Sequence, residues 1–360
     1  WASAEPGKYH SPRPFVIEAG KATIKRGSGK SWTRAFVDGL IDLAEKNDRI
    51  YAMTAGMPDG TGLNLFEERF PERCRDIGIA ESCTVDMAGG MAKAGVTPVA
   101  AIYSTFLQRA YDQVFQEVVL QGLPVVLCLD RAGLVGSDGA VHHGFADIAF
   151  LRPMPNMVLM APCDEPELRE ALKFACASDK PCAIRYPRDN VPGTCIPNCP
   201  PFELGLSRRV RTGTDATILS YGAVTNEALA AADLLEANDV SVTVINARFA
   251  KPIDRRMIRD AFTDHRPVVT VEDHALQGGF GSIVLETAGD MGIDASNLTR
   301  LGLPDRFIEH GARGSQLSEV GVDATGIAAT VLAMVEGTSS PTSDRHPDSI
   351  RGVRRLPVDS

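Results

Sequence analysis

The sequence has no excess of basic residues. Its 37 Lys and Arg residues are outnumbered by 46 Asp and Glu residues, and the formal net charge is -9. Binding nucleic acid requires clustered positive charge that neutralises phosphates, so this composition excludes a general nucleic-acid binder. An anionic substrate would have to be held by a few well-placed arginines.

Long apolar runs and paired cysteines are also lacking. The apolar runs are the size of strands, so we expect neither a signal peptide nor a membrane span. The eight cysteines include no CxxC pair, which is typical of reduced thiols in a cytoplasmic protein. Cys195 and Cys199 are spaced CxxxC without a second pair, so we assign no metal ligand within the chain.

Strand-like and helix-like segments alternate along most of the chain. This alternation predicts an α/β fold of two domains, each with a mainly parallel sheet flanked by helices. A stretch rich in Pro, Cys and Gly interrupts the rhythm and indicates the boundary between the domains. The predicted parts are a linker (1–27), a first domain (28–195), a second domain (210–337) and a disordered tail (338–360).

Glu81 follows the short apolar run DIGIA and precedes a helix rich in small residues. This pattern predicts a strand that ends at Glu81, a helix after it, and a second strand from Val96 to Tyr103. The next segment, FLQRAYDQVFQEVVLQG, has helical apolar spacing and predicts one amphipathic helix. Its expected apolar stripe consists of Leu107, Ala110, Tyr111, Val114, Phe115, Val118 and Val119.

Polar residues gather in segments that come at or after the ends of predicted strands. These segments are Glu81, YSTFLQR (103–109), DRAGLVGSDGAVHHG (130–144) and RYPR (185–188). Since the carboxyl ends of parallel strands share one edge of a sheet, we expect the segments to converge. The sequence therefore predicts one site with acids, histidines, arginines and aromatic rings.

The motifs AIYSTFLQRAYDQ, DRAGLVGSDGAVHHG and RYPRDN resemble the pyrimidine-binding domain of the 1-deoxy-D-xylulose-5-phosphate synthase family. This family belongs to the thiamine-diphosphate enzymes of the transketolase superfamily. The later runs NARFAKPID, TVEDHALQGGFGS and LGLPDRFIEHG resemble the C-terminal domain of the same family. The resemblance extends over roughly residues 7–335.

The resemblance implies a transferase that condenses pyruvate with glyceraldehyde 3-phosphate, releasing CO₂, for isoprenoid (terpenoid) and thiamine biosynthesis. Thiamine diphosphate would be the cofactor, with Mg²⁺ held by an N-terminal domain that bears a GDG motif. The sequence has no GDG and begins with Trp1. We therefore expect a portion that lacks this domain, is inactive alone, and forms a cytoplasmic homodimer or pairs with such a domain.

The resemblance also implies roles for single residues. Glu81 would hydrogen-bond the pyrimidine N1′ of the cofactor, Phe106 would stack on its ring, and Ile79 would contact it. His142 and His10 would assist donor binding and proton transfer. The acceptor site, with arginines gripping the substrate phosphate, would be formed by Tyr103, Arg109, Arg131, Asp138 and Arg188.

Plainer interpretations stay open at this stage. Arg109 has Asp112 as a helical neighbour, Phe106 suits a core, and Asp138 suits a turn. The family usually has Glu-Gln-His where this chain has Glu81-Ser82-Cys83, which is compatible with a non-catalytic degenerate homologue. A separate β-type subunit of a transketolase or 2-oxo-acid dehydrogenase is the other alternative.

Overall fold

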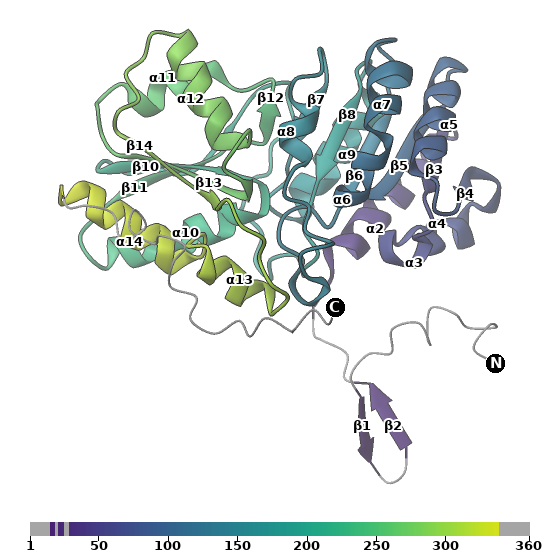
Figure 1. Ribbon diagram of the computed structural model, residues 1–360, viewed down its shortest axis with the longest axis horizontal. Helices are drawn as coiled ribbons and strands as arrows, with labels where there is room; N and C mark the ends of the chain where they lie inside the picture. The colour runs from purple at the N-terminus through teal and green to yellow at the C-terminus, as the bar shows by residue number, and fades with distance from the viewer. Residues whose placement is uncertain (1–14, 19–20, 25–28, 338–360) are drawn as a thin grey trace, which may run out of the picture.

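The computed structural model describes residues 15–18, 21–24 and 29–337. Two sheets lie next to each other, and each is covered by helices on both faces (Figure 1). The sheet nearer the N-terminus belongs to the first domain, and the one nearer the C-terminus belongs to the second. The predicted fold class, two α/β domains with mainly parallel sheets, is confirmed.

Within the described residues the first sheet has seven strands in the order β12-β7-β8-β6-β5-β3-β4. They are β3 (Ile50–Thr54), β4 (Cys74–Asp76), β5 (Thr97–Tyr103), β6 (Val126–Asp130), β7 (Val158–Met160), β8 (Cys182–Arg185) and β12 (Phe249–Lys251). All pairings are parallel except that of β12, which comes from the later half of the chain and joins β7 antiparallel. The sheet of the first domain is therefore completed by the second half of the sequence.

The side chains of the central strand β6 point alternately to the two faces of the sheet, and a layer of helices covers each face. Val126 and Cys128 lie in the core under one face, and Leu127 and Leu129 lie in the core under the other. The first face is covered by α2 (Trp32–Ala44), α4 (Leu63–Arg69) and α9 (Glu165–Ala177). The opposite face is covered by α5 (Glu81–Lys93), the segment that follows β5, and α8 (Asp147–Leu151). The short α3 (Pro58–Thr61) precedes α4.

The second sheet has the order β14-β13-β10-β11-β9, counted among described residues. Its strands are β9 (Arg208–Arg211), β10 (Ala216–Tyr221), β11 (Val242–Asn246), β13 (Val268–Ala275) and β14 (Leu298–Leu303), of which only β9 pairs antiparallel. The helices of this domain are α10 (Thr225–Glu236), α11 (Arg255–Phe262), α12 (Phe280–Asp290), α13 (Arg313–Glu319) and α14 (Ala324–Val335). Apolar residues of α11 and α12 share one core with the first domain, so the two domains pack together.

One stretch, Arg313–Val335, is apolar and long enough by composition to cross a membrane. The structure divides it into α13 and α14 at a turn where Gly321 has φ 72°. The longer of the two helices has 12 residues, and about 20 are needed to span a bilayer. Ile327 and Val331 of α14 are fully buried against the second domain, as expected for a core helix.

Some expected elements differ from those observed. The predicted linker contains a hairpin of β1 (Phe15–Glu18) and β2 (Lys21–Ile24), whose strands are too short to show periodicity. The strand expected at DIGIA is wrong, because β4 ends at Asp76 and a loop follows. Gly78 (φ 77°) bends this loop, and its N–H and that of Gly56 donate to Asp76 Oδ1.

The single amphipathic helix predicted after β5 is also wrong. The segment consists of α6 (Ser104–Leu107), a 3₁₀ turn (Gln108–Ala110), α7 (Tyr111–Gln113) and a π-helix (Val114–Val119). The tighter and wider turns change the number of residues per turn, so the apolar face rotates along the segment. Tyr111 and Phe115 are consequently exposed, although the rest of the expected stripe is buried.

Candidate active site

Glu81 is the first residue of α5, and its side chain is only 4% exposed. Its Oε1 accepts a hydrogen bond from an Arg109 guanidinium nitrogen at 2.7 Å. The N-terminus of a helix favours a negative charge at this position. Among the described residues only Oε1 has a hydrogen-bond donor, so Oε2 is free to bind a ligand atom. The site therefore begins with a buried carboxylate that has one oxygen in use.

Aromatic rings continue from the Glu81–Arg109 pair. The guanidinium of Arg109 lies over the ring of Phe106, with 4.9 Å between its carbon and the ring centroid. Phe106 stacks on Tyr103 with centroids 5.5 Å apart and an interplanar angle of 14°. Ser82 Oγ donates to the backbone oxygen of Arg109 at 2.9 Å and fixes the turn that carries this arginine. Arg109 therefore pairs with the candidate acid, not with its helical neighbour.

Arg131 lies on the other side of Tyr103. Its guanidinium carbon is 3.9 Å from the centroid of the Tyr103 ring, and one of its nitrogens is 2.8 Å from Asp130 Oδ1. The same nitrogen donates to the backbone oxygen of Gly60. Burial raises the pKa of Tyr103 to about 12, so this phenol keeps its proton near neutral pH. Arg131 is thus already engaged by the protein.

His142 connects the ring stack to a second pair of charges. Its imidazole meets Phe106 edge to face with centroids 5.6 Å apart, and its Nδ1 is 3.2 Å from the backbone oxygen of Asp138. The carboxylate of Asp138 pairs with Arg188, with 3.3 Å between Oδ2 and Nε. Arg188 also donates to the backbone oxygen of Val135 at 2.9 Å.

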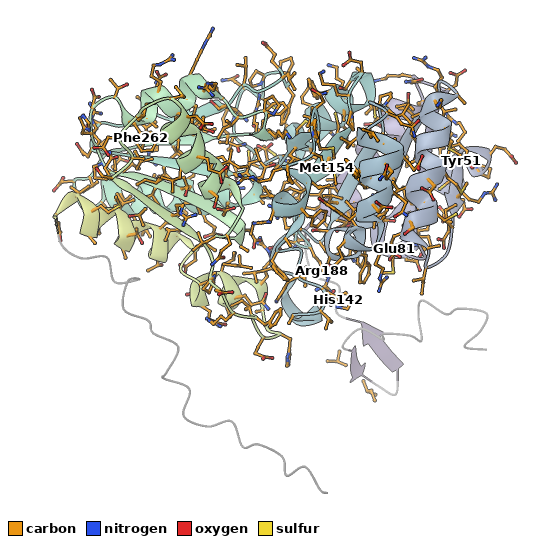
Figure 2. The ribbon with its side chains drawn as sticks, turned by 45° about the horizontal axis from the view of Figure 1, so that its top comes forward. Tyr51, Glu81, His142, Met154, Arg188 and Phe262 are labelled. Carbon is orange, nitrogen blue, oxygen red and sulfur yellow. The ribbon has the colours of Figure 1, made fainter. Side chains whose placement is uncertain are left out.

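The structure therefore brings most of the predicted residues together as one continuous chain of contacts. In Figure 2 Glu81, His142 and Arg188 lie along the same edge of the first domain. The side chains of Arg109 and Arg188 are 53% and 39% exposed, so these two arginines can reach a ligand. The residues in the chain of contacts are Glu81, Tyr103, Phe106, Arg109, Arg131, Asp138, His142 and Arg188.

Two predicted residues are not joined to this chain of contacts. Ile79 lies on the loop before α5 with its side chain 82% exposed. His10 lies outside the described residues. Their predicted roles in cofactor and donor binding stay predictions.

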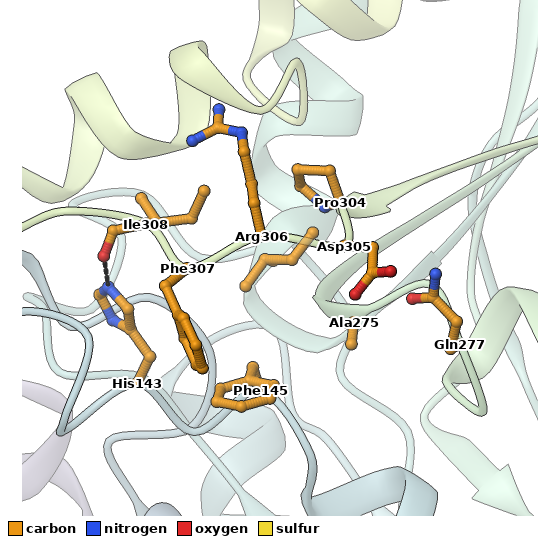
Figure 3. Close-up of a pocket in the computed structure, with 10 residues that line it drawn as sticks. His143, Phe145, Ala275, Gln277, Pro304, Asp305, Arg306, Phe307 and Ile308 are labelled. Atoms are coloured by element: carbon orange, nitrogen blue, oxygen red, sulfur yellow. Dashed lines mark hydrogen bonds between the residues drawn. The ribbon is translucent and has the colours of Figure 1, made fainter. Parts of the chain in front are cut away.

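His143 is a residue whose role the sequence did not reveal. Its Nδ1 accepts from the N–H of Val135 at 3.1 Å, and its Nε2 is 3.1 Å from the backbone oxygen of Ile308 in the second domain. Burial lowers the pKa of this imidazole. Figure 3 shows the ring pointing at Ile308. His143 lines a cavity of about 350 Å³ together with Phe145 and Phe307. The two adjacent histidines thus face different partners, and only His142 faces the ring stack.

A buried group of charges lies where the two domains meet. Arg185 pairs with Asp147 at 2.9 Å between Nε and Oδ2, and both are buried. Glu272 accepts from the N–H groups of Phe280 and Gly281 at the start of α12. Burial raises the pKa of Glu272 to about 8 and lowers that of His274 to about 4.

A second group of acidic residues lies at the start of α9. Ligand atoms of Cys163, Asp164 and Glu167 lie within 4.8 Å of one another. Glu167 Oε1, however, already accepts from Arg208 and Arg248, each at 2.9 Å. These arginines balance the carboxylate charge, so the group is a network between the domains.

Comparison with known proteins agrees with this geometry. Residues 28–194 match the family described as transketolase, pyrimidine binding domain, and residues 205–327 match transketolase, C-terminal domain. A solved structure described as a split gene transketolase, in an inactive β4 tetramer, is 30% identical with a TM-score of 0.76. It covers 86% of this chain, and 99% of that protein is covered in return. The chain belongs to the transketolase family.

Curated relatives narrow the resemblance within that family. The chain is 47% identical over 343 residues to 1-deoxy-D-xylulose-5-phosphate synthase 1 of Geobacter sulfurreducens, covering 94% of this chain and 54% of that protein. It is 48% identical over 338 residues to the 1-deoxy-D-xylulose-5-phosphate synthase of Magnetococcus marinus, with 93% and 54% covered. The family resemblance expected from the motifs is confirmed. The chain spans about half the length of these relatives.

Proposed function

We propose that this chain is the pyrimidine-binding and C-terminal portion of a 1-deoxy-D-xylulose-5-phosphate synthase. The reaction would join pyruvate to glyceraldehyde 3-phosphate with release of CO₂. The observation that carries the proposal is the continuous chain of contacts from Glu81 to Arg188 at one sheet edge. The identity to curated synthases over most of the chain supports it.

The residues at this edge suit the pyrimidine end of thiamine diphosphate. Glu81 offers a buried carboxylate with Oε2 unused by the described residues, and Phe106 offers an aromatic ring beside it. Bound thiamine diphosphate would supply the carbanion chemistry. Glu81 would hold and return a proton at Oε2, and Phe106 would orient the ring by stacking. The diphosphate and its Mg²⁺ would be held by a portion outside this chain.

The exposed cations suit the acceptor substrate. Arg109 and Arg188 have the exposure needed to bind a phosphate, and charge-assisted hydrogen bonds are the strong ones in such sites. Arg131 is held by Asp130 and would fix the position of the Tyr103 ring, over which its guanidinium lies. His142 faces the rings and would move a proton near the reacting atoms.

The wider setting belongs to the same proposal. The product would feed isoprenoid and thiamine biosynthesis in the cytoplasm. The active assembly would be a homodimer in which each chain carries or recruits a diphosphate-binding portion.

The test is reconstitution. The chain would be joined to, or mixed with, the diphosphate-binding portion of a curated relative, and then given thiamine diphosphate, Mg²⁺, pyruvate and glyceraldehyde 3-phosphate. We expect CO₂ release together with 1-deoxy-D-xylulose 5-phosphate, and neither from the chain alone. The proposal fails if the correctly assembled protein binds thiamine diphosphate and yet forms no product.

A second candidate has one specific observation in its favour. The split gene transketolase is covered to 99% of its length by this chain, so a separate β-type subunit has the same domain content. Substrate profiling with a sugar-phosphate donor and with a lipoyl acceptor distinguishes a transketolase or 2-oxo-acid dehydrogenase subunit from the synthase.

A non-catalytic homologue is the remaining alternative. It predicts that the assembled protein does not bind thiamine diphosphate, whereas both enzymatic candidates require binding. Titration calorimetry with the cofactor and Mg²⁺ separates them before any substrate is chosen.

A further inference from the structure

The loop Arg131–Gly144, called here the His142 loop, carries Asp138 and His142 of the candidate site. Its helical content is one 3₁₀ turn, Gly136–Asp138. Buried backbone N–H and C=O groups need hydrogen-bond partners, and this loop has little regular structure to supply them. The partners must come from elsewhere in the protein.

The second domain supplies most of them at the centre of the loop. The N–H of Leu134 donates to Asp273 Oδ1 at 2.9 Å, and its backbone oxygen accepts from Arg313 Nε at 3.0 Å. The N–H of Gly136 donates to Gln316 Oε1 at 2.9 Å, and its backbone oxygen accepts from Gln316 Nε2 at 3.1 Å. Side chains of β13 and α13 therefore satisfy backbone N–H and C=O groups of the loop, as the backbone of a neighbouring strand does in a sheet.

Gln316 makes more hydrogen bonds to this loop than a single donor or acceptor could. It is 2% exposed, and its amide both accepts from and donates to the same residue, Gly136. Its Nε2 donates also to the backbone oxygen of Glu309 at 2.7 Å. An amide side chain offers an acceptor and two donors, and all are used in this geometry. Gly136 has φ 72°, a conformation that favours glycine.

We propose that Gln316, a residue of the C-terminal domain, is a positioning residue that holds the His142 loop in the geometry needed for the reaction. The inference rests on the proposed function of the site. It gives the C-terminal domain a role in catalysis without contact to substrate. Catalytic groups must be held by a supporting shell of hydrogen bonds, and small displacements cost activity.

Two substitutions separate hydrogen bonding from packing. Gln316→Met keeps a side chain of similar length but removes the acceptor and the donors. Gln316→Glu keeps the shape and places a carboxylate opposite the backbone oxygens of Gly136 and Glu309, which it can approach favourably only when protonated. The matched control is Glu319→Gln on the same helix, since Glu319 pairs with Arg306 and both are exposed.

The first readout is hydrogen exchange of the backbone amides of Leu134 and Gly136 in the 360-residue chain. We expect exchange of the Gly136 amide to be at least about tenfold faster in Gln316→Met, because loss of its acceptor opens the amide to solvent. Gln316→Glu keeps an acceptor for this N–H and should change its exchange less. The Leu134 amide donates to Asp273 and shows how far the loss spreads along the loop. The second readout is kinetics of the reconstituted enzyme. There we expect kcat/KM to fall by about a hundredfold, with half-saturation by thiamine diphosphate unchanged, since misplacement by about 1 Å costs this much.

The pH profile adds a readout that a merely structural role would not move. Gln316→Glu should regain activity relative to the unsubstituted enzyme as the pH falls from about 8 to 6, because a protonated carboxyl can donate again. Gln316→Met should show no such recovery. Glu319→Gln should match the unsubstituted protein in all three measurements.

The outcomes decide the inference. It is overturned if Gly136 in Gln316→Met exchanges as it does in the control, or if exchange rises while kcat/KM stays unchanged. If Gln316→Met lowers the melting temperature too far, Gln316→Asn, which shortens the same amide, is measured instead. If the unsubstituted enzyme makes no product, the proposed function fails, whereas unchanged exchange in Gln316→Met is a failure of the loop contact itself.

Discussion

The acidic side chains at the edges of the two mainly parallel sheets differ in their exposure to ligands, although both sheets are built from strands followed by helices. At the edge of the first sheet, Glu81 pairs with a half-exposed arginine, and Arg188 likewise reaches solvent. At the edge of the second sheet, Glu272 and His274 are fully buried. The same topology thus gives one edge that can meet a ligand and one edge that is filled by protein groups.

Backbone amides account for the difference. The carboxylate of Glu272 is occupied by the N–H groups that begin α12. A Cβ at Gly279 would lie 2.1 Å from Glu272 Oε2, so glycine is required for this close approach. Glu81 also lies at a helix start, but as the first helical residue it does not cap its own helix. An acid beside the start of a helix is therefore a candidate for chemistry only when the N–H groups of that helix leave its carboxylate unused.

The largest effect is expected when Glu81 is made an amide. Glu81→Gln should lower kcat of the reconstituted synthase by about a thousandfold, because a positioned acid–base group contributes about 10²–10⁴. Its stability should change by less than about 1 kcal/mol, since the Gln amide has a similar shape and its oxygen can still accept from the half-exposed Arg109. Steady-state kinetics and thermal unfolding measure the two quantities.

The control for this change lies at the same helix. Asp86→Asn makes the same acid-to-amide change at an exposed position of α5 and leaves Glu81 intact. Full activity in Glu81→Gln would remove the distinction between the two edges, because neither acid would then serve chemistry.

The second expected effect is a change in stability caused by Glu272 at the edge of the second sheet. Because burial raises the pKa of Glu272 to about 8, the folded protein binds this proton more tightly than the unfolded chain. The stabilisation is complete below the ordinary value of 4.5 and is lost as the pH rises through 8. Burial lowers the pKa of His274 to about 4, so this imidazole has the opposite effect: the stability it contributes rises with pH. That rise is complete at its ordinary value of 6.5.

Between pH 6.5 and 8, therefore, Glu272 alone of these two groups changes stability. Over this window the unsubstituted chain should lose about 2 kcal/mol more than Glu272→Gln, as measured by urea unfolding at each pH. Glu286→Gln, at an exposed acid on the following helix α12, should keep the original slope. Parallel pH dependences for Glu272→Gln and the unsubstituted chain would show that the second edge does not hold a buried proton.

The sequence contained most of the information about the first edge and little about the second. Strand ends located Tyr103 and Arg188, because the carboxyl ends of parallel strands converge whatever packs above them. Glu81 was located by its position before a helix, since the strand expected to end there stops at Asp76. The local pattern could not show that β12 crosses into the first sheet, or that Gln316 bonds Gly136, since these contacts join residues far apart in the chain. Nor could it locate the 3₁₀ and π turns after β5, which depend on packing.

A third effect separates the two arginines of RYPR. Arg185 is buried with Asp147 where the two domains meet, whereas Arg188 is exposed beside Asp138. Arg188→Ala should raise KM for glyceraldehyde 3-phosphate about tenfold with a smaller change in kcat, as loss of a charge-assisted hydrogen bond predicts. Initial-rate kinetics with varied acceptor measure it, and Arg209→Ala on the exposed edge strand β9 is the control. An unchanged KM would assign phosphate binding to Arg109 or to residues outside this chain.

The smallest effect is expected at Cys83, two residues after the candidate acid. Cys83 is exposed on α5, while Glu81 on the same turn is buried, so the helix turns the thiol away from the carboxylate. Cys83→Ala should change the free energy of unfolding by less than about 0.5 kcal/mol, as is usual for surface substitutions, and should leave kcat/KM within about twofold. Urea unfolding and steady-state kinetics check both values. A large loss of activity would mean that the candidate site extends along α5 beyond Glu81 and includes Cys83.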